Sequence, residues 1–495
     1  MTEKNNGFLR FLLTKNHTGL VYIIGLIVSW LYFLIYSVIQ GGGYARILFF
    51  GNGEDALMDF YNSCRDAAQG IGVYAERHVI YPPLANLYYR FCGAFISDDY
   101  LDTNFEQRLQ FSSTLSNLMI FIVSAIIAAA ILVVLVYCYT DGSKIHRTAI
   151  AISSVISFPY IFLLERGNCL TIVVVLLCFF VFCYNSDNKA ISELACVALA
   201  LAAGFKLYPA VMGLVLIIDK RWKQAIRTTI YGLIAIFAPF VFYGGCYGVK
   251  LWINNLIHFS DSKASVVTFT GTTDVTGAFK AMGIQISFIV PAVICIIAAF
   301  VLKKNHRKHI ALFVTMLTIP GSGGVYSYIF LIIPLLMMFN EEIINIYDYL
   351  YLAVIMAMFM PYVLPLHFEN GYLSINYAVS GLVVLALFLL ITLDLIYSLF
   401  KRFRSKSIIA VIPLVFCFFA PSRSVSADST VIANHTLAPK LQGVSSETVV
   451  VISFAIVFIS VAVVTLGVLA VQYARSNKKK YRGDAHADSN SRQHN

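Results

Sequence analysis

Charge is scarce in this sequence of 495 residues. Asp, Glu, Lys and Arg together make up 13%, whereas hydrophobic residues make up 59%. This excludes an ordinary set of soluble domains, in which about a quarter of the residues are charged. Apolar runs of about 17–25 residues recur along the chain, which is long enough for helices to span a membrane and too continuous for barrel strands. We therefore expect an all-α, polytopic transmembrane helix bundle of about 12–14 spans.

Motifs for metal or redox chemistry are also missing. The ten cysteines form no Cys-x-x-Cys pair, the chain contains no Asp-x-Asp sequence, and His258 and His367 are lone histidines without partners at metal-ligand spacing. We therefore expect no cofactor and no bound metal. Cys64 and Cys92 fall in the same polar loop and could pair, although nothing in the sequence requires it. We expect no removable signal peptide, because the first apolar run is long enough to remain as an anchor.

The net charge of +10 is concentrated in short basic turns between apolar runs, for example in residues 220–227 and 401–406. This distribution is typical of cytoplasmic loops and excludes a nucleic-acid partner; the partner that it indicates is the lipid bilayer. The loop of residues 41–113 is instead rich in acids, which predicts that it lies outside. We expect a multi-pass protein of the plasma membrane with both termini cytoplasmic.

Three regions follow from this pattern. Residues 1–400 form the predicted catalytic transmembrane module, with residues 41–113 as its active-site loop. Residues 401–475 are appended spans around an outer loop at 422–447, and the polar tail of residues 476–495 is expected to be disordered and cytoplasmic. A second polar outer loop is predicted at residues 244–283. The apolar region of residues 190–218 is interrupted at Gly204–Pro209, which predicts a broken helix with Lys206 at the outer boundary.

The polar stretch of residues 53–89 carries the first candidate site residues. Interpreted as an amphipathic helix, it places Asp55, Asp59, Asn62 and Asp66 on one face. Several carboxylates on one face are costly to keep near hydrocarbon unless the face is wet or functional. The stretch ends in a stiff Tyr81-Pro82-Pro83 element.

Further polar residues are predicted at the same outer boundary of the membrane. They are Arg166 with Asn168 in one turn and Lys206 with Tyr208 in the broken helix. For each of them taken singly, the alternative is an interfacial anchor without a catalytic role. For Lys206 a functional role is favoured over an interfacial anchor, because this residue lies inside a helix break rather than at the end of a span.

Several of these segments together resemble glycosyltransferase family 87, of the GT-C class. They are DFYNSCRDAAQGIGVY followed by YPPLANLYYR, then LERGNCLTIVVVLL and GFKLYPAVMGLVLIIDKRW. The resemblance extends over residues 59–336 and rests on the order and spacing of short motifs. In one turn, this chain has Arg-Gly-Asn where the family often has Gly-Gln.

The resemblance implies a membrane enzyme that takes a hexose or pentose from a polyprenyl-phosphate-linked donor. The sugar would pass, with inversion, to a glycan or glycolipid acceptor on the extracytoplasmic face. Asp59 aligns with the loop Asp of the family and would be the general base. The predicted donor phosphate-binding residues are Lys206, Arg166 and Arg65. The predicted substrate-positioning residues are Asp55, Asn62, Asp66, Tyr81, Asn168 and Tyr208.

Three alternatives compete with this interpretation. A flippase or transporter of lipid-linked oligosaccharide predicts charges deep inside spans and two related halves with paired broken helices. A ligase or polymerase of surface polysaccharide shares the donor chemistry but usually has its large polar loop late in the chain. A non-catalytic scaffold would not need carboxylates gathered on one face of a loop.

Overall fold

The computed structural model describes residues 16–39, 41, 57–97, 115–263, 271–319, 324–361, 367–368, 371–372 and 375–403. Helices make up the described fold, apart from one antiparallel pair of two-residue strands, β1 (His367–Phe368) and β2 (Gly371–Tyr372). The predicted all-α class is confirmed. Asp55, the chain after residue 403 and therefore nearly all of the predicted appended region lie outside the described residues.

The described helices fall into three groups along the chain. The first group is α2 (Thr18–Ile39), α3 (Met58–Ala68), α4 (Gly72–Ala75), α5 (Pro83–Gly93), α8 (Leu115–Tyr139), α9 (Lys144–Val155), α10 (Phe158–Arg166), α11 (Leu170–Cys183) and α12 (Lys189–Phe205). The second is the 3₁₀ helix η3 (Tyr208–Gly213), α13 (Leu214–Ile218), α14 (Trp222–Phe237), η4 (Ala238–Phe242), α15 (Gly245–Lys263) and α16 (Val275–Ala281). The last is α17 (Ile289–Val301), α18 (Asn305–Thr318), η5 (Val325–Leu331), α19 (Ile332–Phe339), α20 (Ile346–Phe359) and α21 (Ile375–Phe403).

Five helical segments of the described chain are long and apolar enough to cross a membrane. They are Thr18–Ile39, Ser116–Tyr139, Lys144–Arg166, Trp222–Phe242 and Asn376–Lys401. Five shorter apolar helical segments accompany them: Leu170–Cys183, Tyr208–Ile218, Ile289–Val301, Val325–Phe339 and Ile346–Phe359. The structure is therefore that of a helical membrane protein, because a backbone in hydrocarbon must satisfy its own hydrogen bonds.

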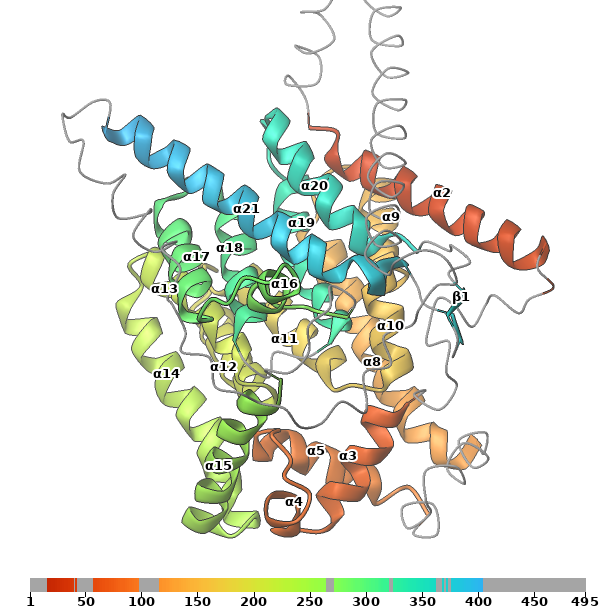
Figure 1. Cartoon of the computed structure of the whole chain (residues 1–495), viewed down its shortest axis with the longest axis vertical. Coiled ribbons are helices and arrows are strands. Elements are labelled where there is room, and N and C mark those ends of the chain that lie inside the picture. Colours follow the sequence, from red (N-terminus) through yellow and green to blue (C-terminus); the bar gives the residue numbers. More distant parts are fainter. Residues whose placement is uncertain are drawn as a thin grey trace, which may run out of the picture.

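The two ends of the bundle differ. Helices α3, α4 and α5 gather at one end, with α15 beside them (Figure 1). At the other end, the Asn340 amide donates to the Tyr139 carbonyl at 2.8 Å, and the Asn16 amide donates to the Met338 carbonyl at 2.7 Å. These hydrogen bonds tie the end of α19 to the end of α8 and to the start of α2. We call the first end the α3–α5 end.

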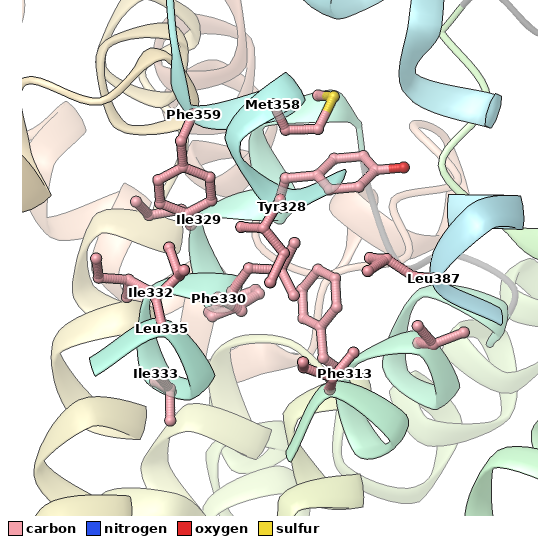
Figure 2. Close-up of a cluster of buried hydrophobic side chains, with 14 of the residues drawn as sticks. Phe313, Tyr328, Ile329, Phe330, Ile332, Ile333, Leu335, Met358, Phe359 and Leu387 are labelled. Atoms are coloured by element: carbon pink, nitrogen blue, oxygen red, sulfur yellow. The ribbon is translucent and has the colours of Figure 1, made fainter. Parts of the chain in front are cut away.

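The apolar core explains how the shorter helices are stabilised. Phe313 of α18, Phe330 of η5, Phe359 of α20 and Leu387 of α21 meet in one buried cluster (Figure 2). The ring of Tyr328 lies in the same cluster, and its hydroxyl donates to the Ser380 carbonyl at 2.6 Å, which satisfies a buried polar group. These helices are therefore surrounded largely by protein, so they need not match the bilayer thickness individually.

Both predicted polar loops contain helices. The amphipathic helix predicted for the first loop is α3, which begins at Met58 after Leu57, whose φ of 57° lies in the left-handed region; Asp55 lies outside the described residues. The stretch of residues 244–283, predicted as a polar outer loop, contains α15 and α16. Its helices are covered by contacts with α4, η4 and α21, which no local pattern reveals.

Candidate functional site

Five polar side chains from four segments meet at the α3–α5 end. They are Asp59 of α3, Tyr81 before α5, Arg166 at the end of α10 with Asn168 just after it, and Lys206 between α12 and η3. We call this group the Asp59 cluster. The structure thus brings together the predicted base, two of the three predicted phosphate-binding cations and two of the predicted positioning residues.

The Asp59 carboxylate accepts a hydrogen bond on each oxygen. Arg166 donates to Oδ1 through Nη2 and forms an ion pair with it, and the Asn168 amide donates to Oδ2 at 2.8 Å. Asp59 also lies in the first turn of α3, where the helix dipole favours a negative charge. The Asp59 side chain is 15% exposed, so it is held in place and still reachable by a ligand.

A glycine turn lets α3 approach α10 closely enough for this contact. Gly167 has φ 68°, and a Cβ built on it would lie 2.7 Å from Cβ of Phe60. The Leu57 amide also donates to the Glu165 carbonyl at 2.5 Å, which joins the start of α3 to the end of α10. Only glycine adopts this conformation without cost and leaves room for Phe60.

Asn168 is oriented by the helix that follows it. Its Oδ1 accepts from the Leu170 amide at 3.2 Å and so helps to cap the start of α11. Because the oxygen faces the helix, the Asn168 amide nitrogen faces Asp59, and it also lies 3.1 Å from the Tyr81 hydroxyl and 3.3 Å from the Tyr326 hydroxyl. Asn168 is buried and links three segments of the cluster.

Tyr81 separates Lys206 from the rest of the Asp59 cluster. The Lys206 ammonium lies 3.7 Å from the centroid of the Tyr81 ring, a cation–π contact. Lys206 has extended backbone, with φ −147° and ψ 136°, because α12 has ended and η3 has not begun. Burial, and then the nearby Asp59 carboxylate, raise the pKa of the Tyr81 hydroxyl well above its usual value. Tyr81 therefore remains a neutral hydroxyl near Asp59.

The backbone around Tyr81 is held by α15. The Trp252 indole donates to the Ile80 carbonyl at 3.0 Å, and the Asn255 amide donates to the Tyr74 carbonyl at 2.9 Å. The Tyr74 hydroxyl in turn donates to the Tyr81 carbonyl at 3.1 Å. The sequence did not predict Trp252 and Asn255 as supporting residues, because both reach the site from a distant part of the chain.

The remaining predicted site residues lie apart or make other contacts. Arg65 pairs with Asp66 at 2.8 Å, and Arg77 lies 3.7 Å from the same carboxylate. Tyr208 is buried, with its ring 6.1 Å from that of Phe330. Asn62 lies on α3, three residues after Asp59, and Asp55 lies outside the described residues. Their proposed roles in positioning substrate or binding phosphate stay predictions.

Cys64 and Cys92 are both buried in the small core of α3 and α5, as free thiols. Burial raises the pKa of the Cys64 thiol and raises that of Cys92 to about 11. Both thiols are therefore neutral and weakly nucleophilic. Within the ranges that the structure describes, no group of three or more His, Cys, Asp or Glu side chains is placed to hold a metal ion.

A second group of charges lies at the opposite end. Asp348 of α20 accepts from Lys304 at 2.6 Å, from His306 at 2.9 Å and from Arg307 at 2.7 Å. Arg307 also donates to Asp394 of α21 at 2.7 Å. We call these five residues the Asp348 cluster. Asp348 and His306 have no exposed side-chain surface, so the centre of this cluster is enclosed where α18, α20 and α21 meet.

Comparison with known proteins supports the sequence resemblance. The model of glycosyltransferase family 87 matches residues 80–321, a little under half of the chain. This range contains Tyr81, Arg166, Asn168 and Lys206, while Asp59 precedes it. No curated protein and no solved structure matches the chain significantly.

Proposed function

Because the match to glycosyltransferase family 87 indicates that this membrane protein is a glycosyltransferase, we propose that it uses a polyprenyl-phosphate-linked sugar as donor. In this proposal, a hexose or pentose passes with inversion to a glycan or glycolipid acceptor on the extracytoplasmic face. The observation that carries the proposal is the Asp59 cluster. It places one partly exposed carboxylate beside Arg166 and close to a Tyr81–Lys206 pair.

The reaction would be a single displacement at the anomeric carbon. Asp59 accepts the proton from an acceptor hydroxyl while the oxygen of that hydroxyl attacks the carbon. The bond between this carbon and the phosphate oxygen breaks, and the polyprenyl phosphate leaves with the electron pair. Attack opposite the leaving group inverts the configuration of the sugar. No nucleotide diphosphate is released, so the proposal needs no metal ion.

The cations would stabilise the leaving phosphate, whose negative charge grows as the bond breaks. Lys206 is the stronger candidate, because it is buried at a helix break and faces the site across the Tyr81 ring. Arg166 holds Asp59 in the ligand-free structure, and we propose that it also contacts the phosphate when donor binds. Arg65 is the weakest of the three, since its carboxylate partner is Asp66.

The test is a transfer assay in proteoliposomes with labelled polyprenyl-phosphate sugars. We expect wild-type protein to transfer the sugar and Asp59→Asn to lose about 10²–10⁴-fold in rate, the usual contribution of a general base. The matched control is Glu76→Gln, which removes an exposed carboxylate of the same loop. Equal rates for Asp59→Asn and wild type would remove Asp59 as the base.

A lipid-linked oligosaccharide flippase is the second candidate function. It would move the labelled lipid between leaflets without releasing polyprenyl phosphate. Wild-type protein that transfers no sugar from any such donor, yet translocates a lipid-linked oligosaccharide, would refute the proposed donor chemistry and support this alternative.

A further inference from the structure

Tyr326 of η5 borders the Asp59 cluster and takes no part in the displacement described above. Its hydroxyl lies 3.3 Å from the Asn168 amide nitrogen, and this nitrogen also donates to the Asp59 carboxylate at 2.8 Å. The Tyr326 hydroxyl and the proposed base therefore contact the same atom, which makes them close neighbours. Tyr326 is half-buried, so a ligand can reach it, whereas Tyr328, two residues later, is fully buried.

The ring of Tyr326 is held in this position by its neighbours. A Cβ built on Gly324 would lie 2.9 Å from Cε1 of Tyr326, so the ring packs directly against the chain at this glycine. The Phe162 ring of α10 also lies nearby, with 6.3 Å between the two ring centroids. Because the ring is already fixed, its hydroxyl can bind a substrate with little further loss of side-chain entropy.

The Asn168 amide cannot donate to all of its neighbours at once. Its nitrogen carries two hydrogens, but three oxygens surround it. They are an Asp59 carboxylate oxygen at 2.8 Å, the Tyr81 hydroxyl at 3.1 Å and the Tyr326 hydroxyl at 3.3 Å. The carboxylate takes one hydrogen, because it is nearest and a charged acceptor forms the stronger bond. The two phenol oxygens compete for the other, and the contact to Tyr326 exceeds the common N–H···O range of about 2.7–3.2 Å.

The hydroxyl hydrogen of Tyr326 is available as well. A phenol donates one hydrogen in addition to accepting. Among the residues that the structure describes, none offers this hydrogen an acceptor within hydrogen-bond distance. A polar group that is withdrawn from water without a partner is costly, so a substrate that supplied an acceptor oxygen here would be favoured.

The position of Tyr326 relative to Lys206 indicates which substrate this is. Attack with inversion places the attacking oxygen and the leaving phosphate on opposite sides of the anomeric carbon. Lys206, assigned above to the phosphate, contacts the cluster through the Tyr81 ring. Tyr326 contacts it through Asn168, next to Asp59. Because the acceptor hydroxyl must reach Asp59, Tyr326 is placed for the acceptor rather than for the phosphate.

We therefore propose that the Tyr326 hydroxyl donates a hydrogen bond to the acceptor and so holds the attacking hydroxyl at Asp59. The inference rests on the proposed function and narrows the class of acceptor. A bond donated to the attacking oxygen itself would weaken it as a nucleophile, so the bond goes to a second hydroxyl on a neighbouring carbon. The acceptor is then a sugar with two adjacent hydroxyls rather than an isolated alcohol. Tyr326 binds this acceptor, and Asp59 remains the base.

Tyr326→Phe tests the inference by removing only this hydroxyl. The matched control is Tyr328→Phe, the same change in the same helix, where the lost hydroxyl donates to the Ser380 carbonyl in the core. Both variants are compared with wild type in proteoliposomes. The donors are labelled polyprenyl-phosphate hexoses and pentoses, the acceptors are octyl glycosides of hexoses and pentoses, and each substrate is varied in turn. Melting temperatures in detergent show whether each variant folds.

We expect Tyr326→Phe to raise the KM for the acceptor about three- to tenfold, the usual effect of one lost hydrogen bond, and to leave the KM for the donor unchanged. Tyr328→Phe should lower the melting temperature and change neither KM. An unchanged acceptor KM in Tyr326→Phe, or an increase in the donor KM instead, would overturn the inference. Wild-type protein that transfers sugar to no acceptor would refute the proposed function, so the two failures are distinguishable.

Deoxy acceptors test the same bond without relying on the folding of a variant. Each is the best octyl glycoside with one hydroxyl next to the attacked position replaced by hydrogen. In wild type, one of them should show the same rise in KM that Tyr326→Phe shows with the parent acceptor. Tyr326→Phe should use this deoxy acceptor no worse than the parent, because the bond is already lost. If every deoxy acceptor matches the parent in wild type, or if the two losses add, the inference is wrong.

Discussion

The two charge clusters of this protein contain similar residues but differ in how exposed they are. In the Asp59 cluster, the central carboxylate is 15% exposed and its Arg166 partner 20% exposed. In the Asp348 cluster, the central carboxylate is fully buried and accepts from Lys304, His306 and Arg307. An ion pair that can be reached by a ligand is suited to chemistry, whereas one that is enclosed by its own partners is suited to holding helices together.

The partners of each carboxylate explain this difference. Both carboxylates lie in the first turn of a helix, but Asp59 pairs with Arg166 and accepts from the neutral Asn168 amide. The Asp348 cluster joins α18, α20 and α21 directly, and Asp348 also closes a capping box with Asn345 at the start of α20. A charge buried in this way is costly unless every partner is present. The comparison therefore predicts that mutations in the Asp59 cluster mainly lower activity, whereas mutations in the Asp348 cluster mainly lower stability.

The largest expected effect on stability is that of Asp348→Asn. This variant leaves Lys304, His306 and Arg307 without their shared carboxylate, and we expect it to lower the free energy of unfolding by about 3–5 kcal/mol. Asp59→Asn breaks a partly exposed pair and should cost about 1 kcal/mol or less. Unfolding in detergent, followed by intrinsic fluorescence, measures both. Equal losses would remove the distinction between the clusters.

The next largest expected effect is on kcat, and it compares one lysine from each cluster, Lys206 and Lys304. Lys206→Met should lower kcat for sugar transfer about a hundredfold, because it removes a charge placed for the leaving phosphate, and Lys206→Arg should retain more activity. Lys304→Met, at the Asp348 cluster, should lower the melting temperature but keep kcat per folded molecule. A similar fall in kcat for both variants would show that Lys206 acts only through the fold.

The smallest expected effect is on the pH dependence of stability. Burial alone would raise the pKa of Glu341, but the His306 hydrogen bond and the charges of His306 and Lys304 lower it in the folded protein. A carboxyl with a lowered folded pKa stabilises the fold above its unfolded pKa of about 4.3, and this stability is lost as the pH falls through the folded value.

Glu341→Gln should therefore destabilise the protein at pH 6 and make little difference near pH 3. Melting temperatures of wild type and variant across this range measure the effect. A difference between them that stays constant with pH would contradict the assignment of this stabilisation to the Glu341 charge.

Much of the helical framework is predictable from the sequence. The first apolar run, predicted to remain as an anchor, is α2, and the break predicted at Gly204–Pro209 separates α12 from η3. Hydropathy and helix-breaking residues act locally, so a window of neighbouring residues is sufficient to find them. The helices inside residues 244–283 were missed because α15 and α16 are short or weakly apolar, and contacts with distant helices stabilise them.

The sequence predicted the members of the Asp59 cluster, but not which of them contact one another. Arg65 was a candidate because it lies in the same loop as Asp59. It follows Asp59 by six residues, which is about 240° around a helix, so it points to a different side of α3. Arg166 is distant in sequence, and the Gly167 turn brings it to Asp59.

By itself, the sequence determined that the chain forms apolar helices, with an acidic segment after the first of them and a lysine in a helix break. These features depend on composition and on short-range backbone preferences. The tertiary structure alone decided that Arg166 and Asn168 reach Asp59, that Tyr326 contacts Asn168 and that α15 supports Tyr81. Such contacts join residues that are far apart in the chain, and only the packing of the helices fixes their distances.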